Sequence, residues 1–138
     1  MAKSSCRFLL DRLNHTEDSF GHCFSYTTLD RSRVHNVNLL AAELLARVYG
    51  KTAEPEYREA SEKALEYTIA RQHADGWWPY GEESSQGWID SFHTGFMLVS
   101  LKGIGEHLAQ RHFRSALKIA AELHLAQLPR HAGDAAIV

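Results

Sequence analysis

Apolar residues recur along this chain at the three- and four-residue spacing of helices, and the alternation typical of strands is nearly absent. The clearest stripe falls within residues 34–49, where a wide apolar face is formed by Val37, Leu40, Ala41, Leu44, Leu45 and Val48. Ser32 or Asn36 offers the N-cap for this segment, and Gly50 is placed to end it as the residue after the last helical turn. The pattern predicts a helix buried along one side.

Four more helices are expected, and the segments between them read as loops. Pro55 suits the first turn of a helix, and Pro129 follows the end of another. The predicted helices cover residues 4–13, 55–72, 88–108 and 111–128; the predicted irregular segments are 14–33, 73–87 and 131–138. The chain is therefore expected to be a single all-α domain over residues 1–138.

A weak internal repeat runs through these helices. Val34 and His35 match Phe92 and His93 at an offset of 58 residues, and both pairs open an apolar helix. The Tyr-Arg-x-Ala pattern that starts at Tyr57 returns at an offset of 56 residues, with phenylalanine in place of tyrosine. Two helix-loop-helix units of similar length, stacked side by side, explain both offsets. The sequence thus predicts antiparallel αα-hairpins.

Composition and charge exclude several classes of function. The net charge is -2 and no Lys/Arg cluster is present, so no nucleic-acid partner is expected. No segment has the length of uninterrupted apolar sequence that a membrane span needs, and no membrane partner is expected. The two cysteines, Cys6 and Cys23, show neither metal spacing nor a disulfide framework. With no signal-peptide pattern at the N-terminus, a cytoplasmic location is the expectation.

The stretch Arg71–Leu101 carries the most distinctive pattern in the chain. A Gln-x-x-Asp-Gly-x-Trp turn starts at Gln72 and leads through an aromatic, glycine-rich loop into a helix with Asp90 and His93 in its first turn. The turn resembles the glutamine-tryptophan repeat of the terpene cyclase and squalene-hopene cyclase superfamily, where it joins outer helices and is not catalytic. The acidic Asp-x-Asp-Asp element of those cyclases is missing, so terpene cyclisation is excluded.

A longer resemblance, over residues 20–101, is to a group of poorly characterised bacterial toroid proteins associated with polysaccharide gene clusters. It rests on Cys-Phe-Ser-Tyr-Thr at Cys23, on His-Asn-x-Asn at His35 and on Trp-Ile-Asp-x-Phe-His-Thr-Gly at Trp88. The resemblance implies an α/α toroid, a six-hairpin barrel whose central cavity is lined by loop aromatics and helix N-termini. This chain supplies about two hairpins and part of another, so a truncated, partial toroid is expected. Such a truncation would leave an apolar side of a helix exposed to solvent, and formation of a homodimer is the simplest way to bury it.

The candidate site combines polar helix starts with loop aromatics. Asp90 and His93 are three residues apart on a helix and share a face, and a histidine beside a carboxylate is suited to acid/base chemistry. Aromatic platforms with polar groups suit a carbohydrate ligand. The expected ligand-binding residues are Tyr26, His35, Asn36, Asn38, Trp78, Tyr80 and Trp88.

Structural roles compete with these functional ones. Asp90 can cap its own helix and bind His93, the aromatics can fill a core, and Asp75 can form a turn before Gly76. Glu82 and Glu83 are expected to be solvated, although Glu82 with Asp90 is the one pair that a glycosidase could use. The spacing of the histidines and cysteines predicts no metal site, and the absence of a phosphate-binding loop predicts no cofactor.

Three functions remain open from the sequence. The preferred one is a ligand-binding or vestigial module with a carbohydrate-type ligand in the aromatic cleft, non-catalytic on its own. The alternative is a polysaccharide-modifying enzyme of the lyase or epimerase type, with Asp90 and His93 as acid and base in a cavity completed by oligomerisation. The third is a purely structural, oligomerising fragment.

Overall fold

The fold is mainly helical, with one small sheet. The computed structural model describes residues 2–108, 118 and 121–122. Its elements are α1 (Ala2–Asp11), β1 (His15–Glu17), β2 (His22–Phe24), α2 (His35–Thr52), α3 (Pro55–Ile69), a 3-10 turn η1 (Ser84–Gln86) and α4 (Ser91–Leu108). The predicted helical class is confirmed. Apart from residues 118 and 121–122, which are helical, the helix expected over 111–128 and the tail at 131–138 lie outside the described residues.

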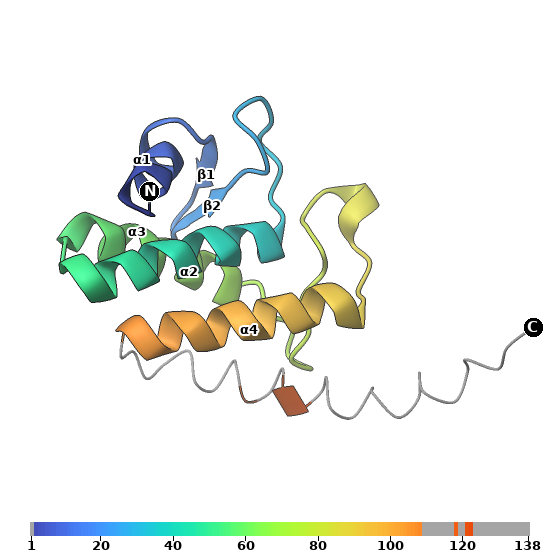
Figure 1. Ribbon diagram of the computed structural model, residues 1–138. Helices are drawn as coiled ribbons and strands as arrows, with labels where there is room; N and C mark the ends of the chain where they lie inside the picture. The colour runs from blue at the N-terminus through green and yellow to red at the C-terminus, as the bar shows by residue number, and fades with distance from the viewer. Residues whose placement is uncertain (1, 109–117, 119–120, 123–138) are drawn as a thin grey trace, which may run out of the picture.

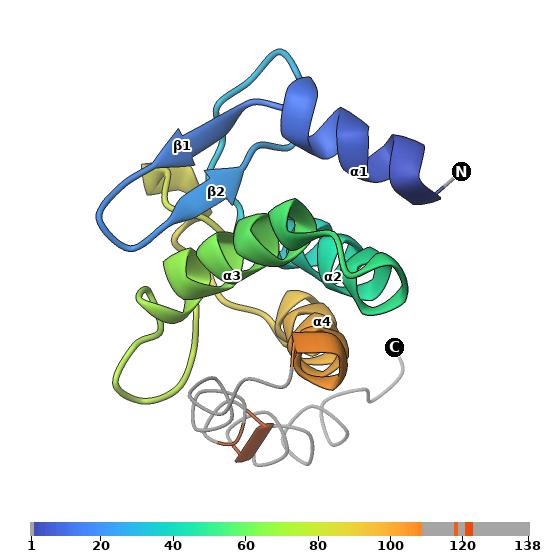
Figure 2. The ribbon, with the colours of Figure 1, turned by 90° about the vertical axis from the view of Figure 1, so that its left-hand side faces the viewer.

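Helix α2 is the centre of the domain. It contacts α3 along one side, α4 along another, and α1 and β2 above them (Figure 1). Figure 2 shows α4 nearly end-on, with α2 and α3 above it and α1 and the hairpin above these. Because neighbouring elements pack on α2 from several sides, its buried face is wider than the predicted apolar stripe and is rotated about the helix axis relative to that stripe. Leu39, Ala42 and Ala46 are fully buried, whereas Leu40, expected inside, is 47% exposed.

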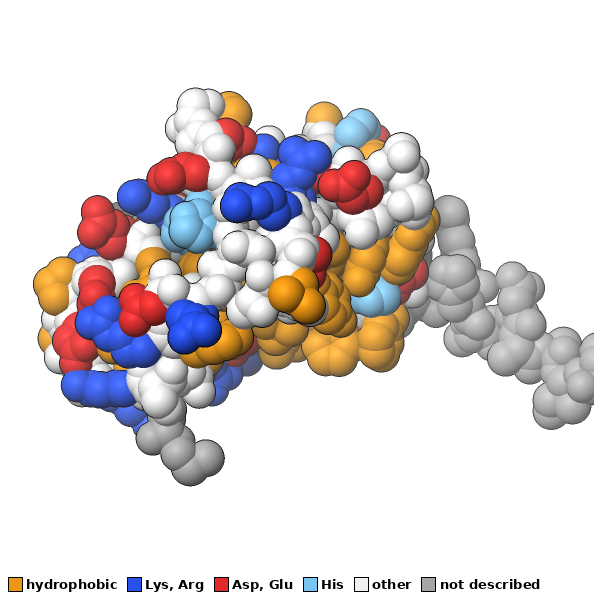
Figure 3. Space-filling model, turned by 90° about the horizontal axis from the view of Figure 1, so that it is seen from above, with side chains coloured by type: hydrophobic (Ala, Val, Ile, Leu, Met, Phe, Trp, Pro, Cys, Tyr) orange, Lys and Arg blue, Asp and Glu red, His pale blue; other side chains and the backbone are white. Residues whose placement is uncertain are grey.

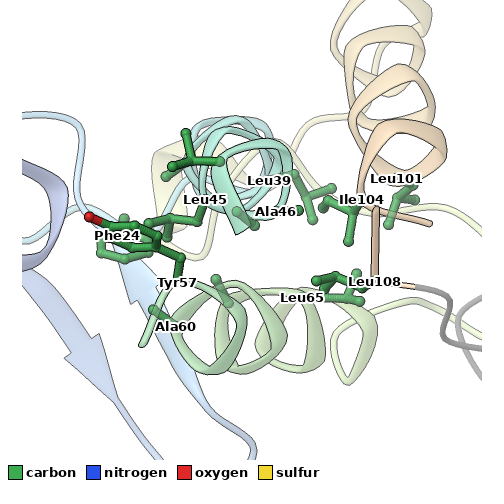
Figure 4. Packing of buried hydrophobic residues seen from close by; sticks show 14 of the residues in the cluster. Phe24, Leu39, Leu45, Ala46, Tyr57, Ala60, Leu65, Leu101, Ile104 and Leu108 are labelled. Carbon is green, nitrogen blue, oxygen red and sulfur yellow. The ribbon is translucent and has the colours of Figure 1, made fainter. Parts of the chain in front are cut away.

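The core lies between α2, α3 and α4, and β2 closes one end of it. Phe24 packs with Tyr57 and Leu45 at the hairpin end, and Leu39, Leu65 and Ile104 meet at the end facing α4 (Figure 4). All six side chains are at most 1% exposed. Burying an aliphatic or aromatic side chain of this size contributes about 1.5–3 kcal/mol, so this cluster is the main source of stability.

The prediction that Gly50 ends the second helix is wrong. Helix α2 continues to Thr52, and Ala53 closes it in the left-handed conformation (φ 55°), donating its N–H to the Tyr49 carbonyl. Gly50 has a different role, because a Cβ there would lie 2.9 Å from Nδ1 of His107. The missing side chain lets the last turns of α2 and α4 approach each other.

The irregular loop predicted over residues 14–33 contains a short antiparallel hairpin. His15, Thr16 and Glu17 pair with Phe24, Cys23 and His22. The three residues of β2 are all buried, because the hairpin lies against α2 and α3. Strands of three residues are too short to carry an alternation that a sequence pattern could detect. Gly21 makes the turn at φ 152° and lies so close to the Lys63 carbonyl that a Cβ would be 2.1 Å from the oxygen.

The other boundaries differ from the prediction by a few residues. The first helix is shifted to 2–11, and the third ends at Ile69, followed by turns in which Arg71 N–H bonds to the Thr68 carbonyl. Helix α4 begins at Ser91, three residues later than expected, because Asp90 acts as its N-cap. Among the described residues, no helix is long and apolar enough to cross a membrane.

Candidate functional site

The starts of α2 and α4 lie at the same end of the domain, where the loop 79–90 covers them (Figure 1). The loop is attached to the first turn of α2, since His35 N–H donates to the Tyr80 carbonyl and Val34 forms an isolated bridge with Gly81. Within the loop, Tyr80 N–H bonds to the Trp88 carbonyl. These backbone bonds hold the candidate residues of both helix starts and the loop together.

Asp90 and His93 form a hydrogen-bonded pair in the first turn of α4. Asp90 Oδ1 accepts the His93 backbone N–H at 2.8 Å, and Asp90 Oδ2 lies 2.7 Å from His93 Nδ1. Burial would raise the pKa of Asp90, but the two bonds from His93 outweigh it and hold that pKa below its ordinary value. The carboxylate is therefore ionised at neutral pH, so Nδ1 of a neutral His93 carries the proton and Nε2 is the acceptor.

The loop aromatics build a platform around His93. The Tyr80 and Trp88 rings are stacked with centroids 4.4 Å apart, and the His93 ring meets both edge-on, at 4.7 and 5.3 Å. Trp88 remains 45% exposed and Tyr26 60% exposed. Burial first, and then the charges of Tyr26 and Asp90, raise the pKa of Tyr80. Figure 3 shows hydrophobic side chains gathered over this end, while charges of both signs cover the other end.

A small cavity lies beneath the platform. It is lined by polar groups of Asn36, Asp90, His93 and Thr94 and closed by the apolar side chains of Trp78, Pro79, Tyr80 and Met97. Its volume of about 10 Å³ is enough for one water molecule and far too small for a sugar. Asn36 Oδ1 is buried with no hydrogen-bond partner among the described residues. This cavity therefore cannot hold a sugar.

Three of the predicted ligand-binding residues lie below the surface. Asn38 is fully buried and makes three bonds: its Oδ1 accepts from Phe24 N–H, and its Nδ2 donates to the Ala64 carbonyl and Thr68 Oγ1. Trp78 is 2% exposed and donates its indole N–H to the Thr68 carbonyl at 2.7 Å. These contacts join the hairpin, α2, α3 and the loop, so both residues support the site from beneath.

His35 is the third buried residue. Its side chain is 0% exposed, and neither ring nitrogen has a hydrogen-bond partner among the described residues. Burial lowers the pKa of His35 from 6.5 to about 4; the charge of Glu82 opposes this, and those of Arg71 and Arg33 add to it. The ring is therefore neutral at physiological pH.

Glu82, expected to be solvated, belongs to an ionic network instead. Its carboxylate binds Arg71 at 2.6 Å, Arg33 at 3.1 Å and the Tyr67 hydroxyl at 2.6 Å. Arg71 also binds Asp18 in the hairpin turn and lies 3.4 Å over the Tyr67 ring. The partners are up to 53 residues apart, so no local pattern could have indicated them. The network fixes Glu82 in place and removes it from the nominated Glu82–Asp90 glycosidase pair.

Other elements of the motif have structural roles. Asp75 is exposed in the turn before Gly76, whose φ is 92° and whose N–H bonds to the His73 carbonyl. Gln72 Nε2 closes the same turn onto the Gly76 carbonyl at 2.9 Å. Within the described ranges, no three His, Cys, Asp or Glu side chains form a group that could hold a metal ion.

Comparison with known proteins adds no assignment. No family model matches the chain, and no curated protein matches its sequence. The function must therefore be argued from the geometry of the site.

Proposed function

We propose that this protein is a binding module for a carbohydrate-type ligand, which stacks on the platform of Tyr80 and Trp88. The observation that carries the proposal is the half-exposed Trp88 ring, fixed by stacking on Tyr80 and bordered by the Asp90–His93 pair. The C–H face of a sugar packs on such a ring, and the hydroxyls bind nearby carboxylate and imidazole groups. Tyr26 is a further exposed aromatic side chain.

We also propose that the domain is a partial α/α toroid. In this proposal α2 and α3, which are joined by two residues, form one αα-hairpin, and α4 opens the next. Two observations support the proposal. The first turns of α2 and α4 lie at the same end of the domain, and the aromatic loop lies over them. In a full toroid these groups would face the central cavity, which agrees with a ligand bound at this end.

The replacement Trp88→Ala is expected to weaken oligosaccharide binding about tenfold in Kd, because one stacked aromatic ring contributes about 1–1.5 kcal/mol. Isothermal titration calorimetry with a panel of neutral and uronic-acid oligosaccharides would measure it. Trp77→Ala is the matched control. The Trp77 ring stacks on His73, with centroids 4.3 Å apart, and not on Tyr80 or Trp88. Equal binding by the Trp88→Ala variant and the unmodified protein, or no binding by any oligosaccharide, would refute the proposal.

A second candidate function is acid/base catalysis on a uronic-acid polymer, and the Asp90–His93 pair favours it. With Nδ1 held by Asp90, His93 Nε2 can accept the proton that a lyase or epimerase removes beside a carboxylate. The water-sized cavity beneath the pair is not required for this chemistry.

If the protein is such an enzyme, His93→Ala is expected to reduce kcat roughly 10²–10⁴-fold, the usual contribution of a positioned base. Binding of the same polymer should weaken only by the loss of one imidazole contact. The circular dichroism spectrum should change little, because His93 is part-exposed. Turnover is followed by the absorbance of the unsaturated lyase product or by epimer analysis. A fall in melting temperature without any turnover in the unmodified protein would assign His93 a structural role.

A further inference from the structure

The exposed side of α4 is an apolar surface with no charged side chain at its centre. It is formed by Phe92, Phe96 and Val99, which are 68%, 45% and 63% exposed; Ile89, just before the helix, is 45% exposed. The Phe92 and Phe96 rings meet edge-on at 4.9 Å. The ion pair of Lys102 with Glu106 lies beyond it, toward the C-terminal end of the helix. Solvent-exposed apolar clusters of this size usually mark an interaction surface.

This surface includes a groove and an exposed aromatic side chain, Phe96. The groove has a volume of about 520 Å³ and is lined by Phe92, Gly95, Phe96, Leu98 and Val99. Gly95 contributes no side chain to this lining, and its neighbour Phe96 is 45% exposed. A two-fold interface requires one surface to be complementary to itself. A large side chain, Phe96, next to a position without a side chain, Gly95, meets that requirement.

We propose that a second copy of this chain binds here, with the two α4 helices antiparallel about a two-fold axis between Gly95 and Phe96. In that register Phe96 of each copy enters the groove over Gly95 of the other, and Phe92 of each copy contacts Val99 of the other. The charged Lys102 and Glu106 lie at the rim.

The apolar area of the α4 surface is consistent with a second copy of the chain as the partner. Four side chains with these exposures present roughly 400 Å² of apolar surface, since a large aromatic side chain has about 150–250 Å². A stable interface buries about 800 Å² on each partner, and a little over half of that area is apolar. The α4 surface can therefore supply the apolar core of a dimer. The proposal does not depend on ligand binding.

The first test is the solution mass, measured by light scattering during size-exclusion chromatography over a dilution series. The unmodified chain of 15.6 kDa is expected at twice that mass. Phe96→Glu is expected to weaken the dimer roughly 100-fold, because a carboxylate would be buried without a partner. Leu29→Glu is the matched control, since Leu29 is 94% exposed in the loop before α2. A monomeric unmodified protein, or a dimer retained in Phe96→Glu, would overturn the proposal.

The second test measures the register. Phe92→Cys and Val99→Cys chains are mixed and oxidised; a disulfide-linked dimer is expected in the mixture and in neither chain alone. The native thiols do not interfere, because Cys6 and Cys23 are 0% exposed. Equal cross-linking in the mixture and in the separate chains would overturn the antiparallel register, as would the absence of cross-linking in a protein that is dimeric.

Discussion

Lowering the pH from above 6.5 to about 4 is expected to remove about 6 kcal/mol of folding stability, of which His35 and His22 each account for about 3 kcal/mol. Burial first, and then the charges of His15 and Lys63, lower the pKa of His22 from 6.5 to about 4, although the charge of Glu17 and a backbone hydrogen bond with Ala60 oppose this. Both rings stay neutral in the folded protein, whereas the unfolded chain takes up a proton on each near pH 6.5. The stabilisation is thus complete above pH 6.5 and is lost as the pH falls toward 4.

This loss is comparable to the whole stability of a typical domain, so acid unfolding is expected as the pH approaches 4. Urea unfolding at a series of pH values would measure the dependence. The variant His35→Leu should lose about half of it, and it should also be at least as stable at pH 7, because the ring makes no hydrogen bond to any described residue. The double variant with His22→Leu should be nearly insensitive over this window. An unchanged pH slope in both variants would contradict the assignment.

Asn38→Ala is expected to cost about 3 kcal/mol, or roughly 10 °C in melting temperature. The side chain is fully buried, and its removal leaves the Phe24 N–H without its acceptor and the Ala64 carbonyl without its amide donor. An unsatisfied buried polar group costs about 1–3 kcal/mol, and a small cavity adds to this. Thermal unfolding followed by circular dichroism would measure the change.

Asn36→Ala is the matched control for that measurement. Asn36 is two residues earlier on the same helix, and its Oδ1 has no partner among the described residues. Its replacement is expected to change the melting temperature little. If the two variants were equally stable, Asn38 would not be the junction that joins β2, α2 and α3.

The sequence predicted those features that depend on neighbours in the chain. The helical class, the proline start of α3 and the pairing of Asp90 with His93 are local, and all three are present. The glycine at position 50 misled the prediction because glycine serves both helix ends and close helix packing, and only the position of His107 distinguishes the two.

Features that depend on distant partners could not be predicted. The hairpin is stable because α2 and α3 cover it, and nothing in the sequence of its three-residue strands indicates this. The position of Glu82 likewise depends on Arg33 and Arg71, which other elements supply. The site was predicted in part for the same reason: Tyr80, Trp88, Asp90 and His93 are near in sequence and meet, whereas the burial of Asn38 and Trp78 depends on α3.

The attachment of the loop 79–90 has a kinetic consequence. The loop is held at Tyr80 and Glu82 by backbone bonds to His35 and Arg33, and at the Glu82 carboxylate by two arginines. A platform held in this way exists before a ligand arrives, so little conformational entropy is lost on binding. Association in a stopped-flow experiment should then show one phase whose rate rises linearly with ligand concentration, without the plateau that a slow closing step would produce.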